Sequence, residues 1–109
     1  MRAVAEAGLS FDALAQLNDA ELEARLTAIT GIGPWTAQIY GMFAMGRADM
    51  FAPGDLALQE AARVLFDLEA RPDANVLAGW AQAWSPWRSV AARALFAYYR
   101  IVKNREGLG

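Results

Sequence analysis

The sequence predicts an all-α protein, a bundle of helices, on three observations. Its 109 residues are rich in Ala, Leu, Arg and Glu, which favour helices, whereas β-branched residues are few. No stretch alternates apolar and polar residues with the period of two that marks a half-buried strand. The hydrophobic content of 56% is typical of a folded domain, and the length fits a single domain.

The N-terminal part of the chain predicts two short helices and the start of a third. The first runs from Met1 to about Gly8, a suitable C-terminal glycine, and a short turn of helix follows around Phe11–Leu17. Asn18, with Glu21 three residues later, forms a capping box that begins the next helix.

That helix and its successor form a pair joined by a tight turn. Apolar residues recur at helical spacing through the first of them: Leu22, Leu26 and Ile29. The segment Gly31–Pro34 ends it, and Pro34 suits the first turn of the second helix. The second helix ends at Gly46 and presents an apolar side: Trp35, Ile39, Met42 and Phe43.

Three further helices are expected after a loop over Arg47–Gly54. Asp55 begins the first, in which apolar residues again repeat at helical spacing: Leu58, Ala62, Leu65 and Leu68. Pro72 opens the second, which runs through Trp84. Ser85 and Pro86 then supply a cap and first turn for the last helix, which extends to about Lys103.

The composition excludes several kinds of site. The chain has no Cys and no His, so disulfides, zinc fingers, iron–sulfur clusters and catalytic triads with His are ruled out. It has no run of 18 apolar residues and no signal-peptide pattern, so we expect no membrane partner and a cytoplasmic location. Catalysis would depend on carboxylate, hydroxyl, Tyr, Lys, Arg or backbone groups.

The charge is unevenly distributed although the net charge is only −2. Residues 1–83 carry five basic and eleven acidic groups, whereas residues 84–109 carry five basic groups against Glu106 alone. The C-terminal helix is therefore a basic element on an acidic protein, either as a solvated face or as a surface for an anionic partner.

The turn at Gly31–Pro34 has the features of an anion site. Glycines leave the backbone bare, so the amides of Gly31, Gly33 and Thr36 would point outward at a helix N-terminus, where a phosphate is favoured. Ile32 would hold the turn against the core. The alternative is a plain helix–turn–helix corner in which the glycines only turn the chain.

Three motifs in the same order resemble the helix-hairpin-helix DNA glycosylase superfamily, and within it the DNA-3-methyladenine glycosylase II group. Leu26–Ala37 (LTAITGIGPWTA) is similar to its hairpin, and Asp49–Gln59 (DMFAPGDLALQ) to its Gly/Pro-rich loop ending in an essential Asp. Trp84–Ser89 (WSPWRS) is similar to a stretch near its C-terminus. The resemblance implies a single region with the hairpin over about 18–46, the loop and Asp over 47–55 and C-terminal helices over 56–103.

The resemblance assigns roles to the hairpin. Its amides at Gly31, Gly33 and Thr36 would hold a phosphate of the damaged strand of double-stranded DNA. Its carbonyls at the matching positions would hold a monovalent cation, Na⁺ or K⁺: Thr27, Ile29 and Ile32. No other cofactor is implied, and the missing cysteines exclude the iron–sulfur members.

Asp55 matches the essential aspartate. Cleavage of an N-glycosidic bond builds positive charge on the deoxyribose, which a carboxylate near C1′ can stabilise while it orients or deprotonates the attacking water. The alternative is that Asp55 only caps a helix, and both roles can coexist.

The resemblance implies a monofunctional glycosylase that excises alkylated purines such as 3-methyladenine during base-excision repair. Members that also cleave the strand have a Lys where Trp35 stands, since a lysine amine can form a Schiff base with the sugar. The one Lys in this chain, Lys103, is expected on an element away from this chemistry.

Aromatic residues are the candidates for the base pocket, because stacking and cation–π attraction select a flipped, cationic base. We assign Trp35, Tyr40 and Phe96 to this pocket, with a core role as the alternative, especially for Tyr40. Core positions are expected for three other aromatics: Trp80, Trp84 and Trp87. The family's other aromatic pocket positions fall on non-aromatic residues here: Ile39, Leu56 and Ala97.

Two arginines of the last predicted helix have two open interpretations. Arg88 and Arg93 would contact DNA phosphates, which makes binding depend on salt, or pair with acidic groups upstream.

Members of the family carry further helices before the matching segment, so we expect Met1 to lie within or just before the last helices of a first helical domain. Apolar faces would then be exposed and favour self-association. Two alternatives to a glycosylase follow: a truncated, non-catalytic DNA-binding fragment, and a helical fragment that binds a partner chain. DNA repair agrees with a cytoplasmic, DNA-associated protein of bacterial type.

Overall fold

The computed structural model describes residues 10–105, and the helix predicted over Met1–Gly8 lies outside the described residues. Within 10–105 every regular element is helical, which confirms the predicted fold class. The α-helices are α2 (Phe11–Ala15), α3 (Asp19–Thr27), α4 (Pro34–Ile39), α5 (Leu56–Leu65), α6 (Ala74–Ala81) and α7 (Arg88–Arg105). No helix in this range is long and apolar enough to cross a membrane.

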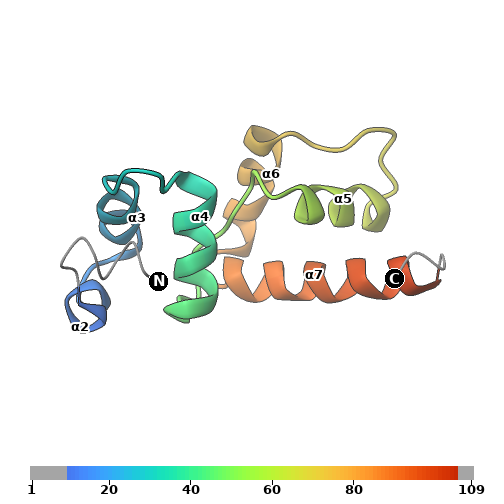
Figure 1. Ribbon diagram of the computed structural model, residues 1–109. Coiled ribbons are helices and arrows are strands. Elements are labelled where there is room, and N and C mark those ends of the chain that lie inside the picture. Colours follow the sequence, from blue (N-terminus) through green and yellow to red (C-terminus); the bar gives the residue numbers. More distant parts are fainter. Residues whose placement is uncertain (1–9, 106–109) are drawn as a thin grey trace.

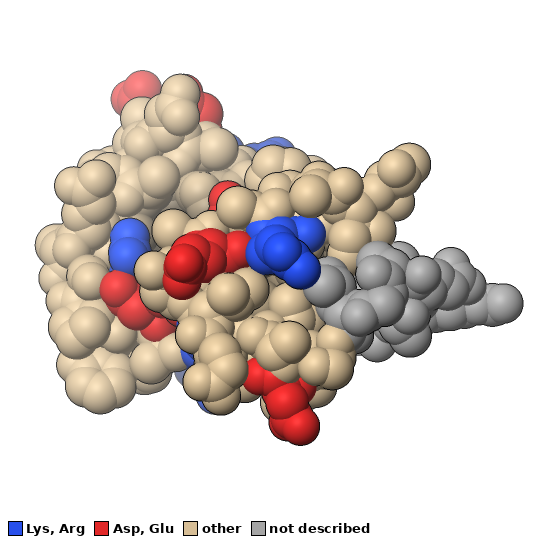
Figure 2. Space-filling model, turned by 90° about the vertical axis from the view of Figure 1, so that its left-hand side faces the viewer, with Lys and Arg blue, Asp and Glu red and all other residues tan. Residues whose placement is uncertain are grey.

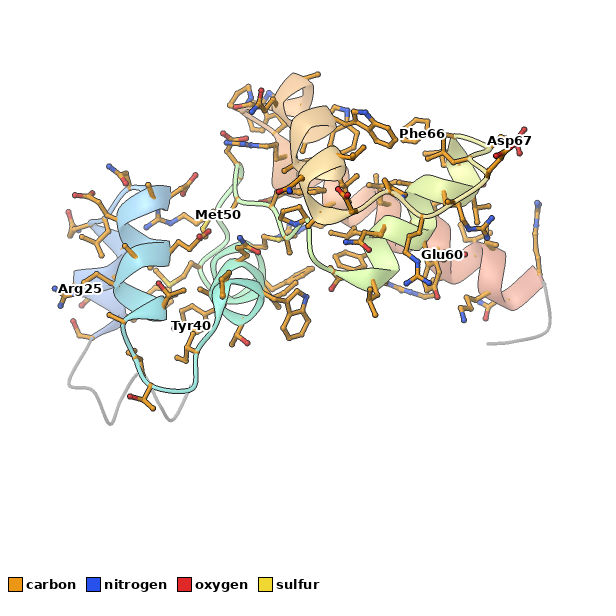
Figure 3. The ribbon with its side chains drawn as sticks, turned by 90° about the horizontal axis from the view of Figure 1, so that it is seen from above. Arg25, Tyr40, Met50, Glu60, Phe66 and Asp67 are labelled. Carbon is orange, nitrogen blue, oxygen red and sulfur yellow. The ribbon has the colours of Figure 1, made fainter. Side chains whose placement is uncertain are left out.

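Helix α4 stands between the α2–α3 pair and the helices that follow it (Figure 1). Helices α5 and α7 lie side by side, and α6 lies beside them at the end nearer α4. The loop that contains Met50 crosses from the α3–α4 pair to the C-terminal helices, as seen from above (Figure 3). The hairpin between α3 and α4 therefore lies at one end of the molecule and the C-terminal end of α7 at the other.

One apolar core joins the two parts. Its fully buried large side chains come from both: Leu14, Leu22, Leu26, Met42, Leu58 and Leu77. Helix α4 continues into a π-helical turn over Tyr40–Ala44, and the chain leaves the helix at Gly46, which has a φ of +64°. The end at Gly46 agrees with the prediction, whereas the π-turn has no signal in the sequence.

Local capping residues begin the helices as predicted in two cases. Asn18 and Glu21 form both hydrogen bonds of the capping box at α3, with distances of 2.8 and 2.9 Å. Asp55 caps α5 through a hydrogen bond from the amide of Leu58 at 3.1 Å. The unpaired amides of a first helical turn are satisfied in this way.

The end of α5 corrects the prediction that Leu68 belongs to that helix. Asp67 has a φ of +54°, and the amide of Leu68 donates to the carbonyl of Arg63 at 2.9 Å. This is the bond pattern of a Schellman C-cap, which closes the helix with a left-handed residue. Leu68 therefore follows the helix.

The starts of α6 and α7 also differ from the prediction. Asp73, rather than Pro72, begins α6, which gives way to a 3₁₀ turn over Gln82–Trp84. Helix α7 begins at Arg88, and Ser85 does not cap it because its hydroxyl donates to Asp49 at 2.7 Å. Asp49 itself accepts from the Arg88 amide at 3.3 Å and so acts as a cap from a distant loop.

The expectation of core positions for three tryptophans is wrong for two of them. Trp80 is 38% exposed and Trp87 is 60% exposed. Trp84 is partly buried and meets the ring of Phe51 edge to face, with the centroids 5.8 Å apart. Trp80 packs in a similar way on the exposed Phe66, so its ring covers the surface rather than filling the core.

Candidate active-site cleft

The turn between α3 and α4 places bare backbone at the surface. Gly31 has a φ of +90°, a conformation that L-residues with a side chain rarely adopt. A Cβ atom added at Gly31 or Gly33 would meet nothing within 4 Å, so both glycines face open space. Ile32 between them is buried, as expected for the residue that holds the turn, and its amide donates to the carbonyl of Ile29 at 3.1 Å.

The backbone amides at this turn precede the hydrogen-bonded part of α4. The first bond of that helix runs from the amide of Ala37 to the carbonyl of Gly33 at 3.1 Å. The amide of Thr36 therefore has no partner within the helix. The structure brings Gly31, Gly33 and Thr36 to one corner, where they are candidates to contact a phosphate.

The carbonyls predicted to hold a cation belong to the same turn. Thr27 is the last residue of α3, where carbonyls lack partners within the helix. The carbonyl of Ile29 accepts one hydrogen bond, from Ile32, which leaves a second lone pair. Ile29 follows α3 rather than extending its apolar stripe, and its side chain packs against the core.

Asp55 occupies the point where the Met50 loop enters α5. Its carboxylate accepts two hydrogen bonds: Oδ1 from the amide of Leu58 at 3.1 Å and Oδ2 from the indole Nε1 of Trp35 at 2.8 Å. The residue is only 9% exposed, yet it lines a cleft. Asp55 is thus a helix cap and also lines the cleft, so the capping role is confirmed and the catalytic role stays a prediction.

The cleft has a volume of about 710 Å³ and lies between α4 and α7. The wall formed by α4 and its π-turn is apolar and aromatic, whereas the wall formed by α7 combines aromatic rings with basic side chains. The lining side chains are Trp35, Ile39, Phe43, Asp55, Arg93, Phe96, Tyr99, Arg100, Lys103 and Asn104. Asp55 is the single carboxylate among them, in an enclosure of rings and cations.

Two of the three aromatic residues assigned to the pocket line this cleft. Trp35 is half exposed, and Phe96 lies 5.9 Å from Phe43, centroid to centroid. Tyr40 instead packs against the core and is not among the lining residues. Leu56 and Ala97 also lie outside the lining, whereas Ile39 is part of it.

Sequence reasoning missed Phe43 and Tyr99 as lining residues. A signal was present for Phe43, because Trp35, Ile39 and Phe43 are spaced by four residues and share one face of a helix. Tyr99 follows Phe96 by three residues and shares its face in the same way.

The position of Lys103 differs from the expectation drawn from the sequence. The sequence placed it away from the chemistry, but it lines the same cleft as Asp55. Its Nζ lies 5.2 Å from the centroid of the Tyr99 ring, a cation–π distance. The packing of α7 along α5 is what brings it there.

Arg88 and Arg93, whose roles the sequence left open, have different partners in the structure. Arg88 pairs with Asp49 through two side-chain hydrogen bonds of 2.9 Å. The bonds from Arg88, assisted by Ser85 and opposed by burial, lower the pKa of Asp49 to about 2. Arg93 donates to the carbonyl of Met42 at 3.0 Å and lies over the ring of Phe43 within the cleft.

Known proteins that are similar to this chain include several named as DNA-3-methyladenine glycosylases. The Bacillus subtilis protein YfjP, named only provisionally as a DNA-3-methyladenine glycosylase, is 36% identical over 95 residues, which cover 87% of this chain and 33% of YfjP. DNA-3-methyladenine glycosylase 1 of Schizosaccharomyces pombe is 32% identical over 77 residues, 71% of this chain and 34% of that protein. No protein-family model matches the chain.

Solved structures agree with the sequence relatives. A DNA-3-methyladenine glycosidase from Bacillus halodurans matches with a TM-score of 0.75 and 35% identity, over 88% of this chain and 45% of that one. The S. pombe 3-methyladenine DNA glycosylase in complex with abasic DNA also gives a TM-score of 0.75, at 29% identity, over 87% and 48% of the two chains. The chain spans about a third to a half of these proteins, and the matches confirm the resemblance drawn from the three motifs.

Proposed function

We propose that this chain, a homologue of part of the DNA-3-methyladenine glycosylases, binds damaged double-stranded DNA. Its Asp55 carboxylate would then promote hydrolysis of the N-glycosidic bond of an alkylated purine by water. One observation carries the proposal: Asp55 is nearly buried at the wall of an aromatic cleft, with each carboxylate oxygen accepting a hydrogen bond. A charge fixed in this way is already oriented before the substrate arrives.

The chemistry follows from that placement. As the bond from C1′ to the base nitrogen breaks, the bonding electrons leave with the purine and positive charge develops on the sugar. Asp55 would stabilise this charge and orient the water whose oxygen bonds to C1′, while the proton that this water loses passes to the carboxylate or to solvent. An alkylated purine is itself cationic, so stacking on Trp35 and Phe96 would favour it over ordinary bases.

The hairpin would position the strand. Amides of Gly31, Gly33 and Thr36 would contact a phosphate beside the target nucleotide. Carbonyls of Thr27, Ile29 and Ile32 are neutral oxygen donors, which suit a monovalent cation such as Na⁺ or K⁺ that would link the hairpin to that phosphate. In this proposal residues 18–46, 47–55 and 56–103 act as hairpin, loop with catalytic Asp, and C-terminal wall of one region.

The proposal includes hydrolysis without strand cleavage, because Trp35 cannot form the Schiff base that a lysine at its position would form. It also places the protein with the DNA that it repairs, which in a bacterium is the cytoplasm.

Base release from duplex DNA that contains methylated purines, measured at low salt, tests the proposal. Asn caps helices as well as Asp does, so Asp55→Asn removes the charge and keeps the cap. We expect it to lower the rate of base release by about 100-fold or more. Asp73→Asn is the matched control, because Asp73 caps α6 with the same bond to the third residue and does not line the cleft.

Equal rates for Asp55→Asn and the unchanged protein would refute the catalytic role. DNA binding without base release from the folded, unchanged protein would favour the alternative of a non-catalytic DNA-binding fragment. Absence of DNA binding at low salt would exclude both.

A further inference from the structure

Three cations follow one face of α7. Arg93, Arg100 and Lys103 are separated by seven and three residues, which places them in a single stripe along a helix. All three line the cleft that contains Asp55. At 1.5 Å per residue the stripe from Arg93 to Lys103 is about 15 Å long.

Four other basic residues of the described chain pair with carboxylates, whereas no ion pair within residues 10–105 joins a carboxylate to this stripe. These ion pairs join Arg47 to Asp19, Arg63 and Arg71 to Glu60, and Arg88 to Asp49. By contrast, Arg93 contacts a carbonyl and the ring of Phe43, and Lys103 lies over the ring of Tyr99. Arg63 and then Arg71 make the larger contributions that lower the pKa of Glu60, and the charge of Lys103 adds to them. Glu60 already pairs with both of these arginines.

The positive charge of Arg93, Arg100 and Lys103 is gathered in the cleft rather than spread over the surface. The side of the molecule formed by α2 and α3 carries acidic and basic side chains intermixed, with no continuous basic area (Figure 2). The stripe instead collects positive charge beside aromatic rings. Rings interleaved with cations suit a nucleic-acid strand, whose bases stack while its phosphates pair with the cations.

The stripe runs from Arg93, which contacts Phe43 in the turn after α4, toward Arg100 and Lys103 in the C-terminal half of α7. The start of α5, where Asp55 is, falls between the α3–α4 turn and the C-terminal half of α7 (Figure 1). A strand held by the hairpin and passing Asp55 would continue toward Arg100 and Lys103. One strand of a DNA duplex carries one charge per about 3.4 Å of the helix axis, so about four phosphates fall within the length of the stripe.

We propose that Arg100 and Lys103, with Arg93 beside them nearer to α4, form a second phosphate-binding site, the second grip, which holds the DNA strand on the far side of the target nucleotide from the hairpin. This inference rests on the proposed function, since its anion is the DNA backbone. The target nucleotide is thereby held from both sides while Asp55 acts on its sugar.

The test is the salt dependence of binding to a DNA duplex that contains an abasic site. Each phosphate contact contributes about 0.9 to the slope of log K against log salt concentration. We expect Arg100→Gln and Lys103→Gln each to reduce the slope by about 0.9, and the double variant by about 1.8. Arg105→Gln is the matched control: it removes one charge from the same helix at an exposed residue outside the cleft lining, so the slope should not change.

The outcomes separate this inference from the proposed function. If the unchanged protein binds DNA, Gly33→Glu in the hairpin weakens binding, and the double variant keeps the full slope, the second grip is refuted and the proposed function stands. An equal loss of slope in Arg105→Gln would show a general effect of charge and also refute the grip. Absence of DNA binding by the unchanged protein would refute both.

Discussion

The indole Nε1 of Trp35 donates a hydrogen bond of 2.8 Å to Oδ2 of Asp55. Trp35 belongs to the first turn of α4, directly after the hairpin, whereas Asp55 caps α5. One bond therefore ties the element that would hold the phosphate to the group that would act on the sugar. Because the bond uses the edge of the indole, the ring face remains available for a base.

Trp35→Phe should slow catalysis more than it weakens binding. Phe keeps an aromatic ring but cannot donate to Asp55, and a hydrogen bond to a charged group contributes about 1.5 kcal/mol. We expect the single-turnover rate of base release to fall by about tenfold, with little change in affinity for abasic DNA. Trp87→Phe, at a tryptophan outside the cleft, serves as control.

An equal rate in Trp35→Phe would show that Leu58 alone holds the carboxylate. A large loss of affinity with an unchanged rate would instead assign Trp35 to stacking only.

The two hairpin glycines should respond differently to the same substitution. Gly31 has a φ of +90°, so Gly31→Ala strains the backbone and should lower the free energy of unfolding by about 1–2 kcal/mol. Gly33 has a φ of −90° and open space around it, so Gly33→Ala should be nearly neutral or slightly stabilising. Urea denaturation of both variants measures the difference. Similar losses in both would contradict the assigned backbone conformations.

The sequence could predict those elements whose signals are local. The capping box at Asn18, the glycine turn and the cap at Asp55 all involve residues within four positions of one another, and each prediction is confirmed. The start of α7 could not be predicted, because its cap comes from Asp49, 39 residues earlier in the chain.

The candidate site divides in the same way. Asp55 and Trp35 lie in motifs, so the sequence could single them out, although not their hydrogen bond. Lys103 reaches the cleft only because α7 packs along α5, which is tertiary structure without a local signal. The exposure of Trp87 has the same origin, since composition alone favours burial of such a ring.

Asp49→Asn should reduce stability in neutral solution and remove part of its pH dependence. The pKa of Asp49 is lowered from 3.8 to about 2 by the bonds from Arg88, so the folded state favours the charged form. A depressed pKa stabilises the fold above the unfolded value and loses this contribution as the pH falls toward 2. We expect a loss of about 1–2 kcal/mol at pH 7.

The difference between Asp49→Asn and the unchanged protein should therefore shrink between about pH 5 and pH 2. Denaturation at a series of pH values measures it. Asp67→Asn is a suitable control, because Asn also tolerates the left-handed conformation of that exposed residue. A difference that stays constant with pH would contradict the ion pair.

Two helical glycines provide the last contrast. A Cβ atom at Gly41 would overlap the thioether of Met50, so this glycine lets the crossing loop pack directly on the π-turn (Figure 3). Gly41→Ala should therefore cost about 1 kcal/mol, because the atoms that must move are the flexible end of the buried Met50 side chain, whereas Gly79→Ala in α6 meets open space and should stabilise by up to about 1 kcal/mol. Because Met50 is in the loop that leads to Asp55, Gly41→Ala should also slow base release, and Gly79→Ala should not. Thermal unfolding and base release measured on both variants test this coupling, which a destabilised but fully active Gly41→Ala would disprove.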